Sequence, residues 1–135
     1  MNVEEIKKEI IRAEKSLNSA KILVKNNYFE DAISRCYYGI LHAAKAALLV
    51  ENINVSSHKA VRRLFGQQII KTGKLDSKYA KILASIQDDR VRADYDVIYL
   101  AEEEDVKESL KIAEDFLNAI KEYLNTRIDL QNTNC

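Results

Sequence analysis

Proline is absent from this chain of 135 residues, and glycine occurs at only three positions. A β-rich domain of this size needs many tight turns, and tight turns need glycine, proline or Asn-Gly pairs. So few turn-forming residues leave room for only a few long elements, and long elements in a chain of this length are helices. The composition, 47% hydrophobic and 31% charged, is that of a globular chain and not of a disordered one.

A net charge is also missing, because 21 basic residues balance 21 acidic ones. No global field would draw such a chain to nucleic acid or to an anionic membrane, so any such binding must come from a local patch. The longest nearly apolar run, from Gly39 to Val50, is interrupted by His42 and Lys45 and is too short to span a bilayer. The N-terminus has no apolar signal-peptide block, so we expect a cytoplasmic chain with no membrane partner.

Cysteine and histidine are too scarce for a disulfide framework or a zinc site. Cys36 falls on an apolar helix face and Cys135 is the last residue, so we expect one buried thiol and one free terminal thiol. Helical bundles hold paired metals through Glu-x-x-His repeats, but the residues three before the two histidines are Gly39 and Val55. The sequence therefore predicts no metal and no cofactor.

Apolar residues recur at helical spacing along most of the chain. The clearest stripe occupies residues 3–24 and stops at Asn26-Asn27, a pair that suits a helix end. A second helix, from about Tyr28 to Val50, is apolar over most of its circumference, which is typical of a central helix. Two shorter helices are predicted at about residues 57–71 and from about residue 77, and the four acids at 102–105 open the last one.

Helix start and stop signals refine these limits. Ser56 or Ser57 can cap the third helix, Gly73 suits its end, and Asp76 or Ser77 can cap the fourth. Residues 88–100 could be a helix end, a kink or a loop. We predict an all-α fold, an antiparallel up-and-down bundle of four to five helices over residues 1–128, with a polar, frayed tail at residues 129–135.

Two segments could carry chemistry. In residues 35–42, Tyr38 and His42 reach the edge of the apolar face; the alternative is a plain helix edge whose polar groups are satisfied by hydrogen bonds. Residues 88–96 contain two arginines and four aspartates. They form either a salt-bridged surface turn or a polar cluster in which Arg90 or Arg92 binds a phosphate or carboxylate through its planar fork.

These segments together resemble the HEPN family (higher eukaryotes and prokaryotes nucleotide-binding). Four pieces match in order: the amphipathic first helix with its short break, residues 32–49 (AISRCYYGILHAAKAALL), residues 57–61 (SHKAV) with Phe65 and Gly73, and residues 90–95 (RVRADY). The resemblance covers about residues 3–124. It implies a helical bundle that commonly forms a homodimer and is often encoded beside, and bound to, a small nucleotidyltransferase, in some cases as toxin and antitoxin.

Active members of the family are metal-independent ribonucleases that use an arginine followed, after four to six residues, by a histidine. In this chain Tyr95 stands at that place, after four residues that follow Arg90, and no histidine follows either Arg90 or Arg92. A histidine exchanges protons near neutral pH, whereas a tyrosine with a pKa near 10 does so poorly. Arg90 and Tyr95 are therefore only weak catalytic candidates.

The leading hypothesis is a HEPN-like partner module, non-catalytic or weakly catalytic, in a toxin–antitoxin-like system. It would form a homodimer and bind a small nucleotidyltransferase, with RNA or nucleotide as a further ligand. Its ligand or partner groove would contain Arg90, Arg92, Asp94, Tyr95, Tyr38, His42 and His58. Two alternatives stay open: a metal-independent ribonuclease toxin, which uses Arg90 with Tyr95 or with a histidine from elsewhere, and a structural oligomerisation bundle.

Overall fold

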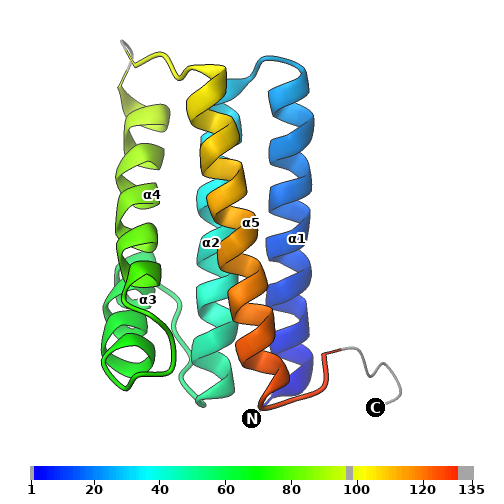
Figure 1. Ribbon diagram of the computed structural model, residues 1–135, viewed down its shortest axis with the longest axis vertical. Coiled ribbons are helices and arrows are strands. Elements are labelled where there is room, and N and C mark those ends of the chain that lie inside the picture. The colour runs from blue at the N-terminus through cyan, green and yellow to red at the C-terminus, as the bar shows by residue number, and fades with distance from the viewer. Residues whose placement is uncertain (1, 97–98, 131–135) are drawn as a thin grey trace.

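Five α-helices and one π-helical turn form the computed structural model, which describes residues 2–96 and 99–130 (Figure 1). In chain order they are α1 (Val3–Lys25), α2 (Phe29–Val50), α3 (His58–Phe65), the π-helical η1 (Gly66–Ile70), α4 (Lys78–Tyr95) and α5 (Glu103–Asn125). No β-strand occurs among the described residues. The predicted all-α fold is therefore confirmed.

The four longer helices run up and down the long axis of the molecule. In Figure 1, α1 and α4 lie on either side of the pair formed by α2 and α5, with α5 in front. The short α3 and η1 fold across the lower end, between the end of α2 and the start of α4. α2 packs against α1, α3, α4 and α5, so it is the central helix that its apolar circumference predicts.

Close approach of α1 to α2 depends on Gly39. A Cβ atom at this position would lie 2.5 Å from Cδ2 of Leu17 and 3.4 Å from the carbonyl oxygen of Ala13. Alanines at positions 43 and 44 are fully buried further along the same helix. Small side chains on α2 thus allow the two backbones to pack closely.

Helix ends follow the local signals in the sequence. Asn27, just after α1, and Asn52, just after α2, have φ of 65° and 62°, in the left-handed region that asparagine tolerates. Gly73, with φ of 79°, turns the chain after η1, and its N–H donates to the carbonyl of Ile70 at 3.0 Å. The breaks predicted at Asn26-Asn27 and at Gly73 are therefore confirmed.

At the start of α3 and of α4, hydrogen bonds show which of the two predicted capping residues is used. The Ser57 hydroxyl accepts a hydrogen bond from the Ala60 N–H at 3.1 Å, so Ser57 caps α3. Before α4, Oδ1 of Asp76 accepts a hydrogen bond from the Lys78 N–H at 2.8 Å. These side chains satisfy N–H groups that the first helical turn leaves without a backbone partner.

The prediction of one regular third helix to about residue 71 is wrong in its last turns. The chain is α-helical only to Phe65 and then widens into η1, where the Lys71 N–H donates to the carbonyl of Gly66. Val61, Phe65 and Ile69 are fully buried and four residues apart, a spacing longer than the α-helical turn. The wider π turn keeps Ile69 on the same buried face.

Residues 88–95, left open by the sequence, belong to α4, which continues to Tyr95. Most of the predicted tail, residues 131–135 with Cys135, lies outside the described residues. Cys36 is fully buried, and burial raises the pKa of its thiol to about 12, so the predicted buried thiol is confirmed. No described helix is long and apolar enough to cross a bilayer.

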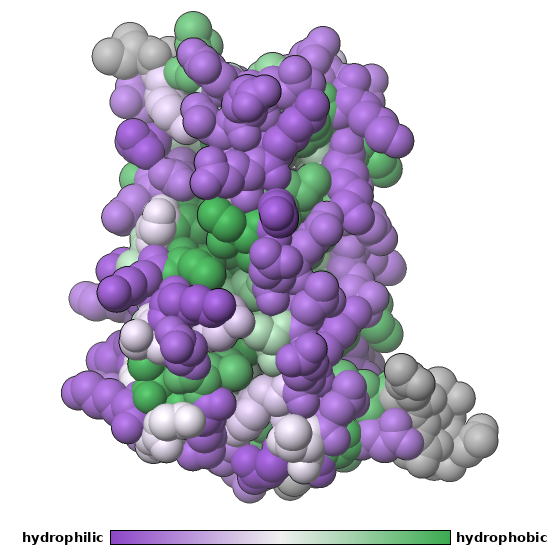
Figure 2. Space-filling model, viewed as in Figure 1, coloured by the Kyte–Doolittle hydropathy of each residue, from purple (hydrophilic) through white to green (hydrophobic). Residues whose placement is uncertain are grey.

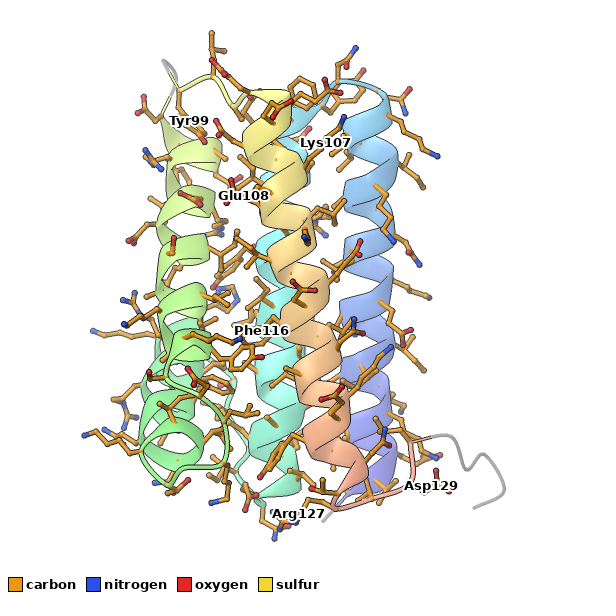
Figure 3. All side chains as sticks on the ribbon, viewed as in Figure 1. Tyr99, Lys107, Glu108, Phe116, Arg127 and Asp129 are labelled. Atoms are coloured by element: carbon orange, nitrogen blue, oxygen red, sulfur yellow. The ribbon has the colours of Figure 1, made fainter. Side chains whose placement is uncertain are left out.

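α5 joins the two sides of the bundle through its side chains. Figure 3 shows Phe116 extending from α5 toward the α4 side, where its ring lies 5.8 Å from Phe65 and 5.7 Å from Tyr79, centre to centre. At the lower end, Tyr123 and Arg127 both donate hydrogen bonds to the Glu51 carboxylate just after α2. The face seen in Figure 2 is mostly polar, with apolar side chains surfacing between α4 and α5.

We predict that Gly39→Ala destabilises the protein by about 1–2 kcal/mol. Overpacking costs about 1–3 kcal/mol, and better helix propensity returns up to about 1 kcal/mol. Chemical denaturation measures the change. Gly66→Ala is the control, because its added Cβ meets no atom within 4 Å at a φ of −61°, and it should be neutral or stabilising. In a Leu17→Ala background the cost of Gly39→Ala should disappear; an unchanged cost would contradict this packing account.

Candidate functional site

Polar side chains between α2 and α4 converge on the guanidinium of Arg90. Its Nη2 donates a hydrogen bond to the Tyr38 hydroxyl at 3.1 Å, and its Nε lies 3.0 Å from Oδ2 of Asp94, one helical turn later. The other carboxylate oxygen of Asp94 accepts a 2.5 Å hydrogen bond from the Ser34 hydroxyl. Two helices thus fix the position of this arginine.

Two tyrosine rings form the floor under Arg90. Its guanidinium carbon lies 5.4 Å from the centre of the Tyr37 ring and 5.7 Å from that of Tyr38, within the range of cation–π attraction. The Tyr37 hydroxyl is hydrogen-bonded to Nδ1 of His58 at 3.0 Å, and the His58 ring lies 5.9 Å from the Tyr38 ring. Arg90 and His58 therefore share one tyrosine pair.

We call these six residues the Arg90 cluster: Ser34, Tyr37, Tyr38, His58, Arg90 and Asp94. Helical spacing explains most of it. Residues 34, 37 and 38 are three and four apart on α2, so they share the face that meets α4. Arg90 and Asp94 are four apart on α4, and the capped start of α3 holds His58 beside them.

Burial and neighbouring charges shift the pKa values of two residues of the cluster, His58 and Tyr37. Burial lowers the pKa of His58, and the nearby charges of Arg90, Lys45 and His42 lower it further. His58 is therefore neutral at pH 7. Burial raises the pKa of Tyr37, against a smaller opposing effect of Arg90, so this phenol stays protonated. The cluster at neutral pH consists of one fixed cation with its carboxylate, two phenols and a neutral imidazole.

Tyr95 and Arg92 lie differently around this cluster. Tyr95 is 70% exposed, and its ring centre lies 5.8 Å from the guanidinium carbon of Arg90, so it stands at the rim. Arg92 forms an ion pair with Asp89 at 2.8 Å. Its guanidinium carbon lies 5.1 Å from the centre of the ring of Tyr99, which follows α4 and is labelled in Figure 3. Of the two arginines, the structure brings only Arg90 together with the predicted residues of α2 and α3.

His42 lies on the α1 side of Tyr38, one turn along α2. Its Nδ1 is 2.6 Å from Oε2 of Glu9. Burial opposes ionisation of Glu9, but the hydrogen bond and charge of His42, with Lys45 and Arg12, outweigh it and lower the pKa of this carboxyl. His42 therefore fits the alternative of a plain helix edge whose polar groups are satisfied by hydrogen bonds. It pairs with Glu9 of α1 and is not part of the Arg90 cluster.

Three residues of this region were missed from the sequence. Ser34 and Tyr37 lie in the matching segment of α2, and their helical spacing from Tyr38 was the available signal. Glu9 had no such signal, because its partner His42 is 33 positions away and the pairing depends on how α1 and α2 align. Among the described residues, no group of three or more His, Cys, Asp or Glu side chains is placed to hold a metal ion.

Comparison with known proteins identifies one family. The model of the HEPN domain matches residues 6–123. A Methanocaldococcus jannaschii protein named "Putative toxin MJ0605" is 38% identical over 121 residues, which cover 90% of each chain. A second protein of that organism, named "Putative toxin MJ0142", is 33% identical over 96% of this chain and 88% of its own. A Thermotoga maritima protein named "UPF0332 protein" is 34% identical over 84% of this chain and 86% of its own.

The lowered pKa of His58 predicts how stability changes with pH. The unfolded chain binds a proton at this residue below about pH 6.5, whereas the folded chain resists it, so the free energy of unfolding falls as the pH drops through that value. We expect His58→Gln to lose less stability than the wild type between about pH 7.5 and about pH 5.5. Urea denaturation at both pH values measures this, and parallel losses in the two proteins would refute it.

Proposed function

This chain belongs to the HEPN domain family, and from that premise we propose that it is the HEPN component of a toxin–antitoxin-like pair that acts mainly by binding. Two relatives that carry the word toxin in their names support such a system. The partner that we propose is a small nucleotidyltransferase, the class of protein beside which prokaryotic HEPN chains are commonly encoded.

The observation that carries this proposal is the setting of Arg90. By the resemblance, Tyr95 stands where active members of the family have a histidine, and its side chain is largely exposed. A phenol is a weak general base at neutral pH. What remains is a pre-positioned guanidinium beside an exposed ring. Its planar fork can exchange Asp94 for a carboxylate or phosphate of a partner without rearranging the helices.

A homodimer is part of the proposal. Val91 and Tyr95 lie one turn apart on α4, next to Arg90, and are 44% and 70% exposed. Aromatic and aliphatic side chains of this kind lose water favourably in an interface. A second copy that covers this face of α4 would bring two Arg90 clusters together and would place the nucleotidyltransferase at a shared groove.

We expect Arg90→Ala to weaken capture of a co-expressed nucleotidyltransferase at least tenfold. Removing an arginine that pairs with a carboxylate of the partner protein, buried in the interface, costs about 2 kcal/mol or more. Arg63→Ala, on the exposed side of α3, is the matched control and should leave capture unchanged. Pull-down gives the capture, and light scattering of the purified chain gives its mass. A monomer that captures no partner would leave only the structural bundle.

A second candidate function, a metal-independent ribonuclease, is favoured by the position of His58. This imidazole stands on the same tyrosine pair as Arg90, and its lowered pKa keeps it neutral and able to accept a proton. It would supply the base that the sequence lacks after Arg90. Its partner hydrogen bond to Tyr37 limits this role, because one ring nitrogen is already engaged.

RNA incubation separates the two functions. We expect the wild type to leave RNA largely intact and Tyr95→His to raise cleavage on the order of a hundredfold, because a histidine beside Arg90 adds an acid–base group that works at neutral pH. Arg90→Ala added to Tyr95→His should abolish that gain. Wild-type cleavage that His58→Gln removes would instead establish the ribonuclease.

A further inference from the structure

A groove between α1 and α2 contains a row of cations that the Arg90 cluster does not use. It has a volume of about 840 Å³, and none of its described lining residues comes from α5. Four cations line it, Lys8, Arg12 and Lys15 from α1 and Arg35 from α2, with no carboxylate among its described lining residues. We propose that this groove binds the phosphate backbone of single-stranded RNA and leads the strand to the Arg90 cluster.

The groove cations differ from two lysines on the α5 side of the bundle, which form ion pairs between helices. On the α5 side, Lys21 pairs with Glu114, and Lys121 with Glu14, at 3.2 and 3.3 Å. Within residues 2–96 and 99–130, no carboxylate is within ion-pair distance of Lys8, Arg12, Lys15 or Arg35. A chain of zero net charge therefore concentrates unneutralised positive charge along one groove.

The groove adjoins further charged groups at both edges. Lys8 and Arg12 also line a neighbouring pocket of about 360 Å³, which adds Lys45 and the acids Glu5 and Glu9. Tyr38 lines the groove on one side and bonds Arg90 on the other, so the groove and the Arg90 cluster meet at this ring.

A surface on which bases can stack lies where the groove and the Arg90 cluster meet. The guanidinium carbon of Arg35 lies 4.7 Å from the centre of the half-buried Tyr38 ring, so a flat cation is supported by an aromatic ring. Bases of single-stranded RNA stack on tyrosine rings and on arginine planes, while lysine and arginine side chains neutralise the phosphates. The hydroxyls of Ser16 and Ser19 in the groove add neutral hydrogen-bonding groups.

The composition of the groove favours RNA over an acidic protein. A protein interface is organised around an apolar centre with a polar rim. Ile11 is the one aliphatic side chain among the described residues that line this groove, and it stands alone among cations and hydroxyls. Such a surface suits a phosphate backbone. The choice of RNA as the polyanion rests on the second candidate function, the ribonuclease, whereas the position of the site rests on the charges.

Fluorescence anisotropy with a labelled single-stranded 2′-O-methyl RNA on the order of ten nucleotides tests the inference without interference from cleavage. Arg12→Ala with Lys15→Ala should weaken binding about tenfold and lower the slope of log affinity against log salt by about 1.4, which is about 0.7 per lost phosphate contact. Both side chains are exposed, so circular dichroism should show an intact fold.

Lys107→Ala with Lys111→Ala on α5 removes the same charge elsewhere and should leave RNA binding unchanged. Equal losses in the two double variants, no loss in either, or no RNA binding by the wild type would overturn the inference. Polyglutamate that competes as well as RNA does would show a site for acidic protein instead.

Capture of the nucleotidyltransferase is measured separately, with Arg90→Ala. Capture without RNA binding would leave the proposed function standing alone, and groove-dependent RNA binding without capture would leave only the inference.

Discussion

The enclosure of α2 is the constraint on which the rest of the structure depends. A helix that is apolar over most of its circumference must be covered nearly all round, and α1, α4 and α5 cover it. Each bulky side chain buried in this way contributes about 1.5–3 kcal/mol. Beyond its first turn, only one line of side chains on α2 is left half-buried, at positions 35, 38, 42, 45 and 49, spaced by three and four.

That line places the chemistry of the protein. Tyr38 stands in its middle, and the two neighbouring helices use its two sides differently. Toward α4, one arginine is fixed over tyrosine rings and beside a carboxylate, an arrangement that suits recognition of a single anionic group. Toward α1, unpaired cations line an open groove, which suits a polyanion. A chain without net charge thus has two adjoining sites that present cations, and both are set by the same half-buried edge of one helix.

Much of the fold was predictable because its signals are local. Helical periodicity, two asparagine breaks, a serine cap and a chain with few turn residues specify an up-and-down bundle with a central second helix. The π-helical η1 was not predicted, because it depends on burying Phe65 and Ile69 together against the core. Its wider turn is a result of tertiary packing, which the helix propensities of the local sequence do not reflect.

The candidate site divides in the same way. The sequence by itself determined which residues were available: Arg90, Asp94, Tyr38 and His58 were all identified from their segments. Only the tertiary structure decided which of them meet. Arg90 and Arg92 look alike in sequence, but residues two apart on a helix point to nearly opposite sides, and the packing of α4 on α2 selects Arg90. Helical spacing is a property of one segment, whereas the alignment of two helices depends on the close packing of their side chains.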